Sequence, residues 1–153
     1  DVPGHTKGHI VFFSDQVTDQ APILFCGDTL FSAGCGRVFE GTYAQMAVSL
    51  NKLKQLPSTT QICAAHEYTL SNLRFALAVE PNNTAVQHHL ALCQSLRAQQ
   101  LPTLPSNLER ELAINPFLRL DQPNVQQAAH QHHAATTDAI DVFAALREWK
   151  NTF

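Results

Sequence analysis

The stretch Pro-Gly-His-Thr-Lys-Gly-His-Ile-Val-Phe-Phe-Ser, residues 3–14, places a histidine directly after a Pro-Gly turn and continues into a short apolar run. We predict a strand over residues 9–14, a polar turn over 15–20 and a second strand over 23–26, which together form a hairpin. A third strand is predicted over residues 61–65. The two later strands are continuous apolar runs, which is typical of strands covered on both faces.

Between the second and third strands, apolar side chains recur with the 3.6-residue period of one helix face. This pattern predicts a helix over residues 43–56. Thr42 and Gln45 have the spacing of a capping box at its start, and Pro57 ends it.

The sequence pattern changes near residue 70, after which only helices are predicted. Asn83 is a candidate N-cap for the second of these helices, and Ser106 with Glu109 has the spacing of a capping box for the third. The predicted helices cover residues 70–79, 84–99, 106–113, 124–131 and 137–150. We therefore predict an α+β part over residues 1–69 and an all-α domain over 70–153.

Composition limits the classes of protein to which the chain can belong. With 153 residues, of which 44% are apolar and 15% charged, it can bury a core. The net charge of −3 argues against nucleic acid and against polybasic attachment to a membrane, and no apolar run is long enough to span one. The four cysteines form no Cys-x-x-Cys pair, so we expect a reducing, cytoplasmic location. The absence of an initiating methionine at Asp1 is typical of a trimmed or fragmentary chain.

Three residues with metal-binding side chains lie where predicted strands meet loops. They are His5, Asp28 and His66. Each alone is more often a surface or turn residue, but the ordered series favours a metal site, since imidazole and carboxylate suit zinc, iron or manganese. Asp28 has two oxygens and could bridge two metals, which would generate a hydroxide nucleophile near neutral pH. Three ligands are too few for two metals, so we expect the first ligands to lie upstream.

The motifs around these residues resemble those of glyoxalase II, the hydroxyacylglutathione hydrolase family of the metallo-β-lactamase fold. The resemblance covers almost the whole chain, including the basic last helix. Its motifs are Pro-Gly-His-Thr-Lys-Gly-His (3–9), Cys-Gly-Asp-Thr-Leu-Phe (26–31), Gly-Cys-Gly-Arg (34–37), Glu-Gly-Thr (40–42), His-Glu-Tyr-Thr (66–69), Val-Glu-Pro (79–81) and Asn-Pro-Phe-Leu-Arg (115–119). It implies the C-terminal part of an αββα metallo-β-lactamase domain in residues 1–69 and a glutathione-binding helical domain in 70–153.

The resemblance also implies the roles of the metal-binding residues. His5 would be the third histidine of the first metal site, Asp28 the bridging carboxylate with a catalytic role, and His66 the last ligand of the second site. The cofactors would be two divalent metal ions, zinc first, with iron or manganese as alternatives. A metal-bridging hydroxide would attack the thioester S-D-lactoylglutathione and release glutathione and D-lactate. The family's His-x-His-x-Asp-His motif has no counterpart here, so the chain alone is expected to be inactive.

For the substrate, the resemblance implies that Arg37, Tyr68, Arg147 and Lys150 bind the glutathione thioester. Cations suit the two carboxylates of glutathione. From the residues alone, Arg147 and Lys150 are an ordinary pair of charges that interact with the dipole of the last helix. Phe39 stands where tyrosine is common in the family, so one hydrogen bond of about 1 kcal/mol is in doubt.

Two alternatives remain open. One is a persulfide dioxygenase of the same superfamily with a single iron; the length of the helical region argues against it. The other is a non-catalytic module that binds glutathione or a protein. As the C-terminal part of a glyoxalase II, the chain would leave an apolar face and a strand edge of its half sheet exposed, so we expect poor solubility or self-association unless the missing half is present.

The remaining histidines and one cysteine have less specific interpretations. His9 is expected to be structural or to support a metal ligand, and Cys35 to be a small residue in a tight turn. No two histidines in the two clusters have the i, i+4 spacing that clamps a metal. We expect these five to face solvent: His88, His89, His130, His132 and His133.

Overall fold

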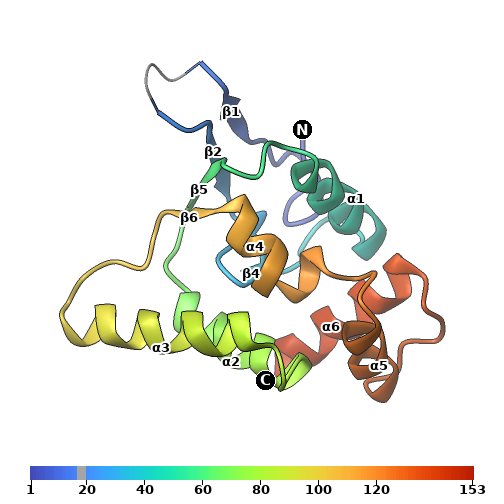
Figure 1. Cartoon of the computed structure of the whole chain (residues 1–153). Coiled ribbons are helices and arrows are strands. Elements are labelled where there is room, and N and C mark those ends of the chain that lie inside the picture. The colour runs from blue at the N-terminus through green and yellow to red at the C-terminus, as the bar shows by residue number, and fades with distance from the viewer. Residues whose placement is uncertain (17–19) are drawn as a thin grey trace.

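The computed structural model describes residues 1–16 and 20–153, and over these residues it combines a small mixed sheet with six α-helices (Figure 1). The mixed α and β content predicted from the sequence is therefore confirmed. The predicted polar turn at residues 15–20 lies partly outside the described residues.

The main sheet has the strand order β1-β2-β5-β6. β1 (Phe12–Ser14) and β2 (Ile23–Gly27) pair antiparallel, which confirms the predicted hairpin, although β1 is shorter than the predicted strand. β5 (Gln61–Ala64) pairs parallel to β2, so the loops after these two strands leave the same edge of the sheet. β6 (Ser106–Asn107) pairs antiparallel to β5 and was not predicted.

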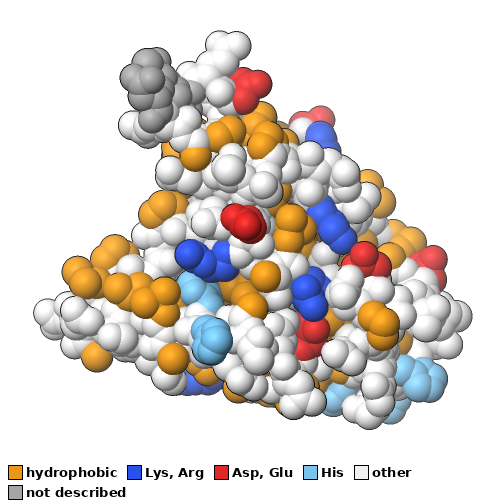
Figure 2. Space-filling model, viewed as in Figure 1, with side chains coloured by type: hydrophobic (Ala, Val, Ile, Leu, Met, Phe, Trp, Pro, Cys, Tyr) orange, Lys and Arg blue, Asp and Glu red, His pale blue; other side chains and the backbone are white. Residues whose placement is uncertain are grey.

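One face of the β1–β2 hairpin is apolar and uncovered by the described residues. Side chains alternate across a strand, so Leu24 and Cys26 are buried while Phe25 is 53% exposed and Phe12 is 65% exposed. The prediction that β2 is covered on both faces is therefore wrong. Figure 2 shows apolar side chains gathered at this end of the molecule.

A second, smaller hairpin follows β2. Its strands are β3 (Leu30–Phe31) and β4 (Gly34–Cys35), joined by a two-residue turn in which Ala33 has φ of 56°. All six residues of this hairpin are buried. Two-residue strands carry no recognisable alternation, so the sequence did not predict the hairpin, which lies directly after Asp28.

The first three helices follow the predictions closely. α1 (Tyr43–Lys54) begins with the predicted capping box, because Thr42 and Gln45 exchange hydrogen bonds with each other's backbone amides. α2 (Thr69–Val79) follows β5 after a short loop. α3 (Thr84–Ala98) begins at the predicted cap, where the Asn83 side chain accepts hydrogen bonds from two backbone amides.

The cap predicted for the next helix is wrong. Asn107, rather than Ser106, caps it by accepting a hydrogen bond from the amide of Arg110 at 2.8 Å. The Ser106 hydroxyl instead donates to the buried carboxylate of Glu111. The remaining helical elements are α4 (Leu108–Ile114), the 3₁₀ helix η1 (Pro116–Leu118), α5 (Pro123–Gln131) and α6 (Ala139–Thr152).

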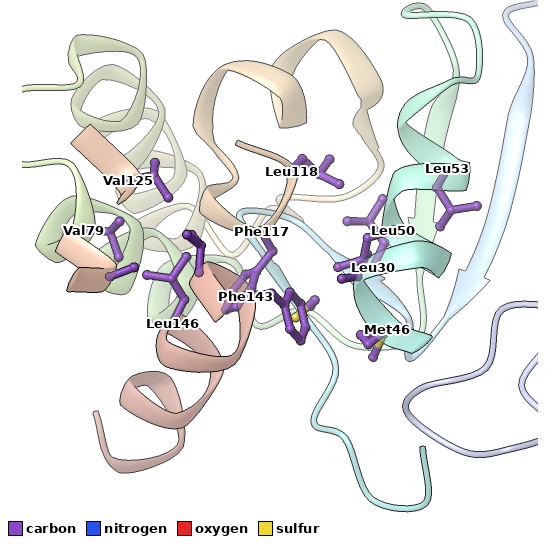
Figure 3. Close-up of a cluster of buried hydrophobic side chains, with 14 of the residues drawn as sticks. Leu30, Met46, Leu50, Leu53, Val79, Phe117, Leu118, Val125, Phe143 and Leu146 are labelled. Carbon is purple, nitrogen blue, oxygen red and sulfur yellow. The ribbon is translucent and has the colours of Figure 1, made fainter. Parts of the chain in front are cut away.

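The main core runs through both parts of the chain (Figure 3). Leu30 and Leu50, from the first 69 residues, belong to the same buried cluster as Phe117, Phe143 and Leu146 from the helical region. The rings of Phe117 and Phe143 lie 5.5 Å apart. This packing fixes α6 against the sheet region, while the domain boundary at residue 70 remains a prediction.

No helix among the described residues combines the length and the apolar character needed to cross a membrane.

Candidate functional site

The three predicted metal-binding residues come together at one edge of the sheet. Asp28 follows β2 and His66 follows β5, and the parallel pairing of these strands brings both loops to the same place. His66 Nε2 lies 3.4 Å from Asp28 Oδ1, and His5 Nε2 lies 4.0 Å from Asp28 Oδ2. Each imidazole thus faces a different oxygen of one carboxylate.

The His5 ring is oriented by its second nitrogen. Nδ1 lies 2.8 Å from the carbonyl oxygen of Arg37, and because a carbonyl only accepts, Nδ1 carries the hydrogen. The Nε2 that faces Asp28 is then unprotonated in the neutral ring and able to bind a metal. A carbonyl partner of this kind commonly fixes the orientation of metal-binding histidines.

His9 lies behind Asp28 and supports its loop. The backbone amide of Asp28 donates to His9 Nε2 at 3.2 Å, in agreement with the supporting or structural position predicted for His9. Gly27 has φ of +52°, and a Cβ added there would lie 2.7 Å from His9 Nε2. The turn that presents Asp28 therefore depends on glycine before it.

Gly36 allows the β3–β4 hairpin to fold back onto Asp28. Its amide donates to the carbonyl of Thr29 at 3.2 Å. A Cβ at this position would lie 1.9 Å from the Asp28 carbonyl oxygen, which no side chain can tolerate. The spacing of Gly-Cys-Gly at 34–36 thus follows from the close approach of two loops at the site.

The donor types suit a metal ion, and the spacing fits one on the His66 side of Asp28. Two ligand atoms about 2.0–2.1 Å from a tetrahedral zinc lie about 3.4 Å apart, which matches the His66–Asp28 separation, and the His5–Asp28 separation is wider. Within residues 1–16 and 20–153, no group of three or more His, Cys, Asp and Glu side chains meets the requirements for one metal site. Two imidazoles thus lie near the two oxygens of one carboxylate.

A pocket of about 520 Å³ extends from this carboxylate to the last helix. It contains six of the seven residues that sequence reasoning assigned to metal or substrate. These are His5, Asp28, Arg37, Tyr68, Arg147 and Lys150. His66 lies at its edge, where its ring stacks on Tyr68 with 5.1 Å between centroids.

Arg147 is buried at the far end of the pocket. Only 2% of it is exposed, so the interpretation as an ordinary helix-end charge is wrong. Its Nη1 donates to the Cys35 carbonyl at 2.9 Å, and its guanidinium lies 5.3 Å from the centre of the Phe117 ring. Its buried Nε has no hydrogen-bond partner among the described residues. A buried cation with a free donor is suited to an anionic ligand.

Lys150 lies one turn further along α6. Its Nζ is 4.9 Å from the centre of the Phe75 ring, which gives a cation–π contact. Burial, reinforced by repulsion from Arg147, lowers the pKa of Lys150 to about 8. The amine is therefore still largely protonated at pH 7, and an anion nearby would favour its charged form.

Three residues at the pocket mouth are more exposed. Arg37 follows the β3–β4 hairpin, and Tyr68 lies in the segment that carries His66. The ring of Phe39 lies 5.2 Å from that of His5 and has no hydroxyl to offer a ligand. Cys35 lies in β4 rather than in the predicted tight turn, and burial raises the pKa of its thiol.

Sequence reasoning missed several pocket residues. A sequence signal existed only for Ser71 and Asn72, which lie about one helical turn after Tyr68, near the start of α2. The missed residues are Phe31, Gly36, Ser71, Asn72, Asn151 and Phe153.

The structure also explains two quoted motifs that carried no assigned role. Glu80 of Val-Glu-Pro and Arg119 of Asn-Pro-Phe-Leu-Arg form a bidentate ion pair, with N–O distances of 2.8 and 2.9 Å. Glu80 is buried, and Arg119 also donates to the Leu112 carbonyl. The pair ties α2 to the segment after α4.

The solvent-facing prediction for the histidine clusters is wrong at two positions. His89 is buried beside Cys93, with 3.5 Å between Nε2 and Sγ, and burial lowers its pKa to about 4. His132 stacks on Trp149 with 3.6 Å between ring centroids. His88, His130 and His133 are exposed, as predicted.

Comparisons with known proteins identify the family of the chain. Residues 67–153 match the family model described as hydroxyacylglutathione hydrolase C-terminus. The chain is 58% identical, over its whole length, to the hydroxyacylglutathione hydrolase of Albidiferax ferrireducens, and 52% identical to that of Cupriavidus taiwanensis. It spans 60% and 57% of the lengths of these two curated relatives. The family model covers 57% of this chain, and the curated relatives match it along its whole length. This chain therefore belongs to the hydroxyacylglutathione hydrolase family.

Proposed function

We propose that this chain is the C-terminal part of a metal-dependent hydrolase that cleaves the thioester S-D-lactoylglutathione into glutathione and D-lactate. The observation that carries this proposal is one pocket that has His5 and Asp28 at one end, with His66 at its edge, and the buried Arg147 and half-buried Lys150 at the other. The relatives are named hydroxyacylglutathione hydrolase, and the family membership supports the same chemistry here.

The polarity of the pocket suggests how a glutathione thioester would lie in it. Arg147 and Lys150 suit a glutathione carboxylate, because desolvated cations bind an anion more strongly than exposed ones do. The thioester would then lie toward Asp28, with Arg37 and Tyr68 beside the peptide-like middle. The ring of Phe39 lies 5.2 Å from that of His5 and the ring of Phe31 lies 6.2 Å from that of His66, so both rings line the pocket near Asp28.

In this proposal two divalent metal ions, with zinc preferred over iron or manganese, supply a hydroxide nucleophile and stabilise the oxyanion when bound. His5 with Asp28 Oδ2 would hold one ion, and His66 with Asp28 Oδ1 the other. The contact between His5 Nδ1 and the Arg37 carbonyl keeps Nε2 free for this purpose. This chain matches 60% of the Albidiferax relative. The remaining ligands, and the rest of a metallo-β-lactamase domain, would come from a part of the protein that corresponds to the unmatched 40%.

The test is reconstitution. This chain is fused behind the residues of the Albidiferax relative that precede the matched part; we call this fusion the joined enzyme. Purified with zinc, the joined enzyme is expected to hydrolyse S-D-lactoylglutathione, while this chain alone does not. The joined enzyme with Asp28→Asn is the control. A folded, metal-loaded joined enzyme without thioesterase activity would refute the proposal.

A non-catalytic glutathione-binding module is a second candidate, since the cationic end of the pocket lies entirely within this chain. It predicts glutathione binding by the chain alone in the presence of a chelator, measured by calorimetry. The persulfide dioxygenase alternative has no comparable support. Hydrolysis without sulfite formation by the joined enzyme would exclude it.

We also propose a cytoplasmic location, supported by the four free cysteines, which suit a reducing compartment.

The exposed apolar face of β1 and β2 further supports self-association of the isolated chain. Sedimentation should detect oligomers that the double variant Phe12→Glu/Phe25→Glu disperses, whereas Val48→Glu, an equally exposed apolar position on α1, should not. A monomeric unmodified chain at high concentration would contradict this.

A further inference from the structure

Glu111 of α4 is a fully buried carboxylate that accepts four hydrogen bonds. Its Oε2 accepts from the Ala33 amide at 2.7 Å and from Asn115 Nδ2 at 3.1 Å. Its Oε1 accepts from the hydroxyls of Ser32 at 2.9 Å and Ser106 at 2.5 Å. Two of these donors belong to the turn of the β3–β4 hairpin, 78 and 79 positions earlier in the sequence.

Asn115 also forms hydrogen bonds to this hairpin. Its Nδ2 also donates to the carbonyls of Phe31 at 3.2 Å and Gly34 at 3.0 Å, while its Oδ1 accepts from the Phe117 amide. The turn residue Ala33, with φ of 56°, adopts a conformation that is unusual for a residue with a side chain. The hydrogen bond from its amide to Glu111 stabilises that conformation.

The hairpin in turn connects to both ends of the pocket. The Gly36 amide donates to Thr29, and the Gly36 backbone packs against the Asp28 carbonyl. One residue further, the Arg37 carbonyl orients His5. The Cys35 carbonyl accepts from Arg147. A shift of the hairpin would therefore move Asp28 and His5 relative to each other.

We propose that Glu111 is a positioning residue for thioester hydrolysis: through the β3–β4 hairpin it holds Asp28 and His5 in their working geometry. This inference rests on the proposed function. It assigns to a side chain of the helical region, outside the pocket, control over residues at the strand ends. Burial raises the pKa of Glu111, and the four donors around it oppose that effect.

Glu80 provides a matched control within the same chain. It is also a buried carboxylate with several donors, but its side-chain partners, Arg119 and Asn83, make no hydrogen bond to the hairpin among the described residues. Replacing either glutamate with aspartate shortens a buried carboxylate by one methylene. Both substitutions should lower the melting temperature, but only the one at position 111 should alter the geometry of the site.

The experiment compares Glu111→Asp and Glu80→Asp in the zinc-loaded joined enzyme, well below both melting temperatures. Glu111→Asp is expected to lower kcat about tenfold or more, with unchanged metal content and KM within about threefold, as for other residues that orient metal ligands. Glu80→Asp should leave kcat unchanged. Glu111→Gln should restore most of kcat, because its oxygen can accept from the two N–H donors while its amide donates to the two hydroxyls.

A spectroscopic readout separates this inference from the proposed function. In the joined enzyme stripped of metal by a chelator, ¹⁵N NMR should show His5 protonated at Nδ1, whereas Glu111→Asp should give a tautomer mixture. If Glu111→Asp does not fold, Ser106→Ala removes a single donor and should give a smaller shift of the same kind. The inference would be overturned if Glu111→Asp and Glu80→Asp changed kcat equally, or if the His5 signal of Glu111→Asp were unchanged. Absence of thioesterase activity in the unmodified joined enzyme would instead overturn the proposed function.

Discussion

The two ends of the pocket are built in different ways. At the strand-end side, His5, Asp28 and His66 come from three loops that backbone hydrogen bonds hold together, and their side chains are 18%, 30% and 53% exposed. At the helical side, Arg147 and Lys150 share one face of α6 and rest on the rings of Phe117 and Phe75. Under the proposed function, the helical side would bind the substrate and the strand-end side would hold part of the metal site. Substitutions should separate the two.

The largest effect is expected at the strand-end side. Asp28→Ala in the joined enzyme removes the carboxylate that faces both imidazoles. We expect kcat to fall by more than about 100-fold, since loss of partners behind metal ligands alone costs about 10–100-fold. Glutathione affinity, measured by calorimetry, should stay within about threefold because the cationic end is untouched. A similar loss of affinity and of kcat would mean that the two ends are not separable.

At the helical side, Arg147→Met should weaken substrate binding rather than lower kcat. A hydrogen bond to a charged group contributes about 1.5–3 kcal/mol, so KM for the thioester should rise by about 10–100-fold. The melting temperature should also fall, because the Cys35 carbonyl loses its donor. Arg74→Met on the exposed side of α2 is the matched control and should change neither quantity. An unchanged KM for Arg147→Met would place the anion elsewhere.

The pKa of Lys150 predicts how the binding end responds to pH. Because this pKa is lowered to about 8, the charge that attracts the ligand is present below pH 8 and is lost above it. We expect KM to rise by up to about tenfold per pH unit above 8, and Lys150→Arg to remove this rise. Folding stability responds with the opposite sign. Between about pH 8 and 10.5 the unfolded chain binds the extra proton, so the contribution of Lys150 to stability increases with pH. A KM that is independent of pH up to 9.5 would contradict the assignment.

The smallest effect is expected at the pocket mouth, between the two ends. Phe39→Tyr adds one hydroxyl beside His5 without removing any packing. If it donates to the ligand, KM should fall by up to about fivefold, which corresponds to about 1 kcal/mol. Phe39→Leu, which offers no hydroxyl, is the control. An equal or higher KM for Phe39→Tyr would show that the hydroxyl finds no acceptor on the ligand.

Sequence reasoning performed best where a structure depends on near neighbours. The capping box of Thr42 and Gln45 lies within four residues, and the β1–β2 hairpin is two apolar runs separated by a polar turn. It failed for β6, because this strand depends on pairing with β5 much earlier in the chain, and it selected the wrong one of two neighbouring candidates for the cap of α4. Ser106 has the spacing of a capping residue, but Glu111 takes its hydroxyl and Asn107 caps the helix.

For the candidate site, local sequence specifies which residues end the strands and which lie on one face of α6, because alternation and the 3.6-residue period are properties of short segments. Their environment comes from contacts across the chain. His5 takes its orientation from a carbonyl 32 residues away, and Arg147 is buried against a carbonyl 112 residues away. Burial, and with it the lowered pKa of Lys150, depends on the packing of α6 against the hairpin and α2. No short segment contains that information, since desolvation arises only when distant parts of the chain exclude water together.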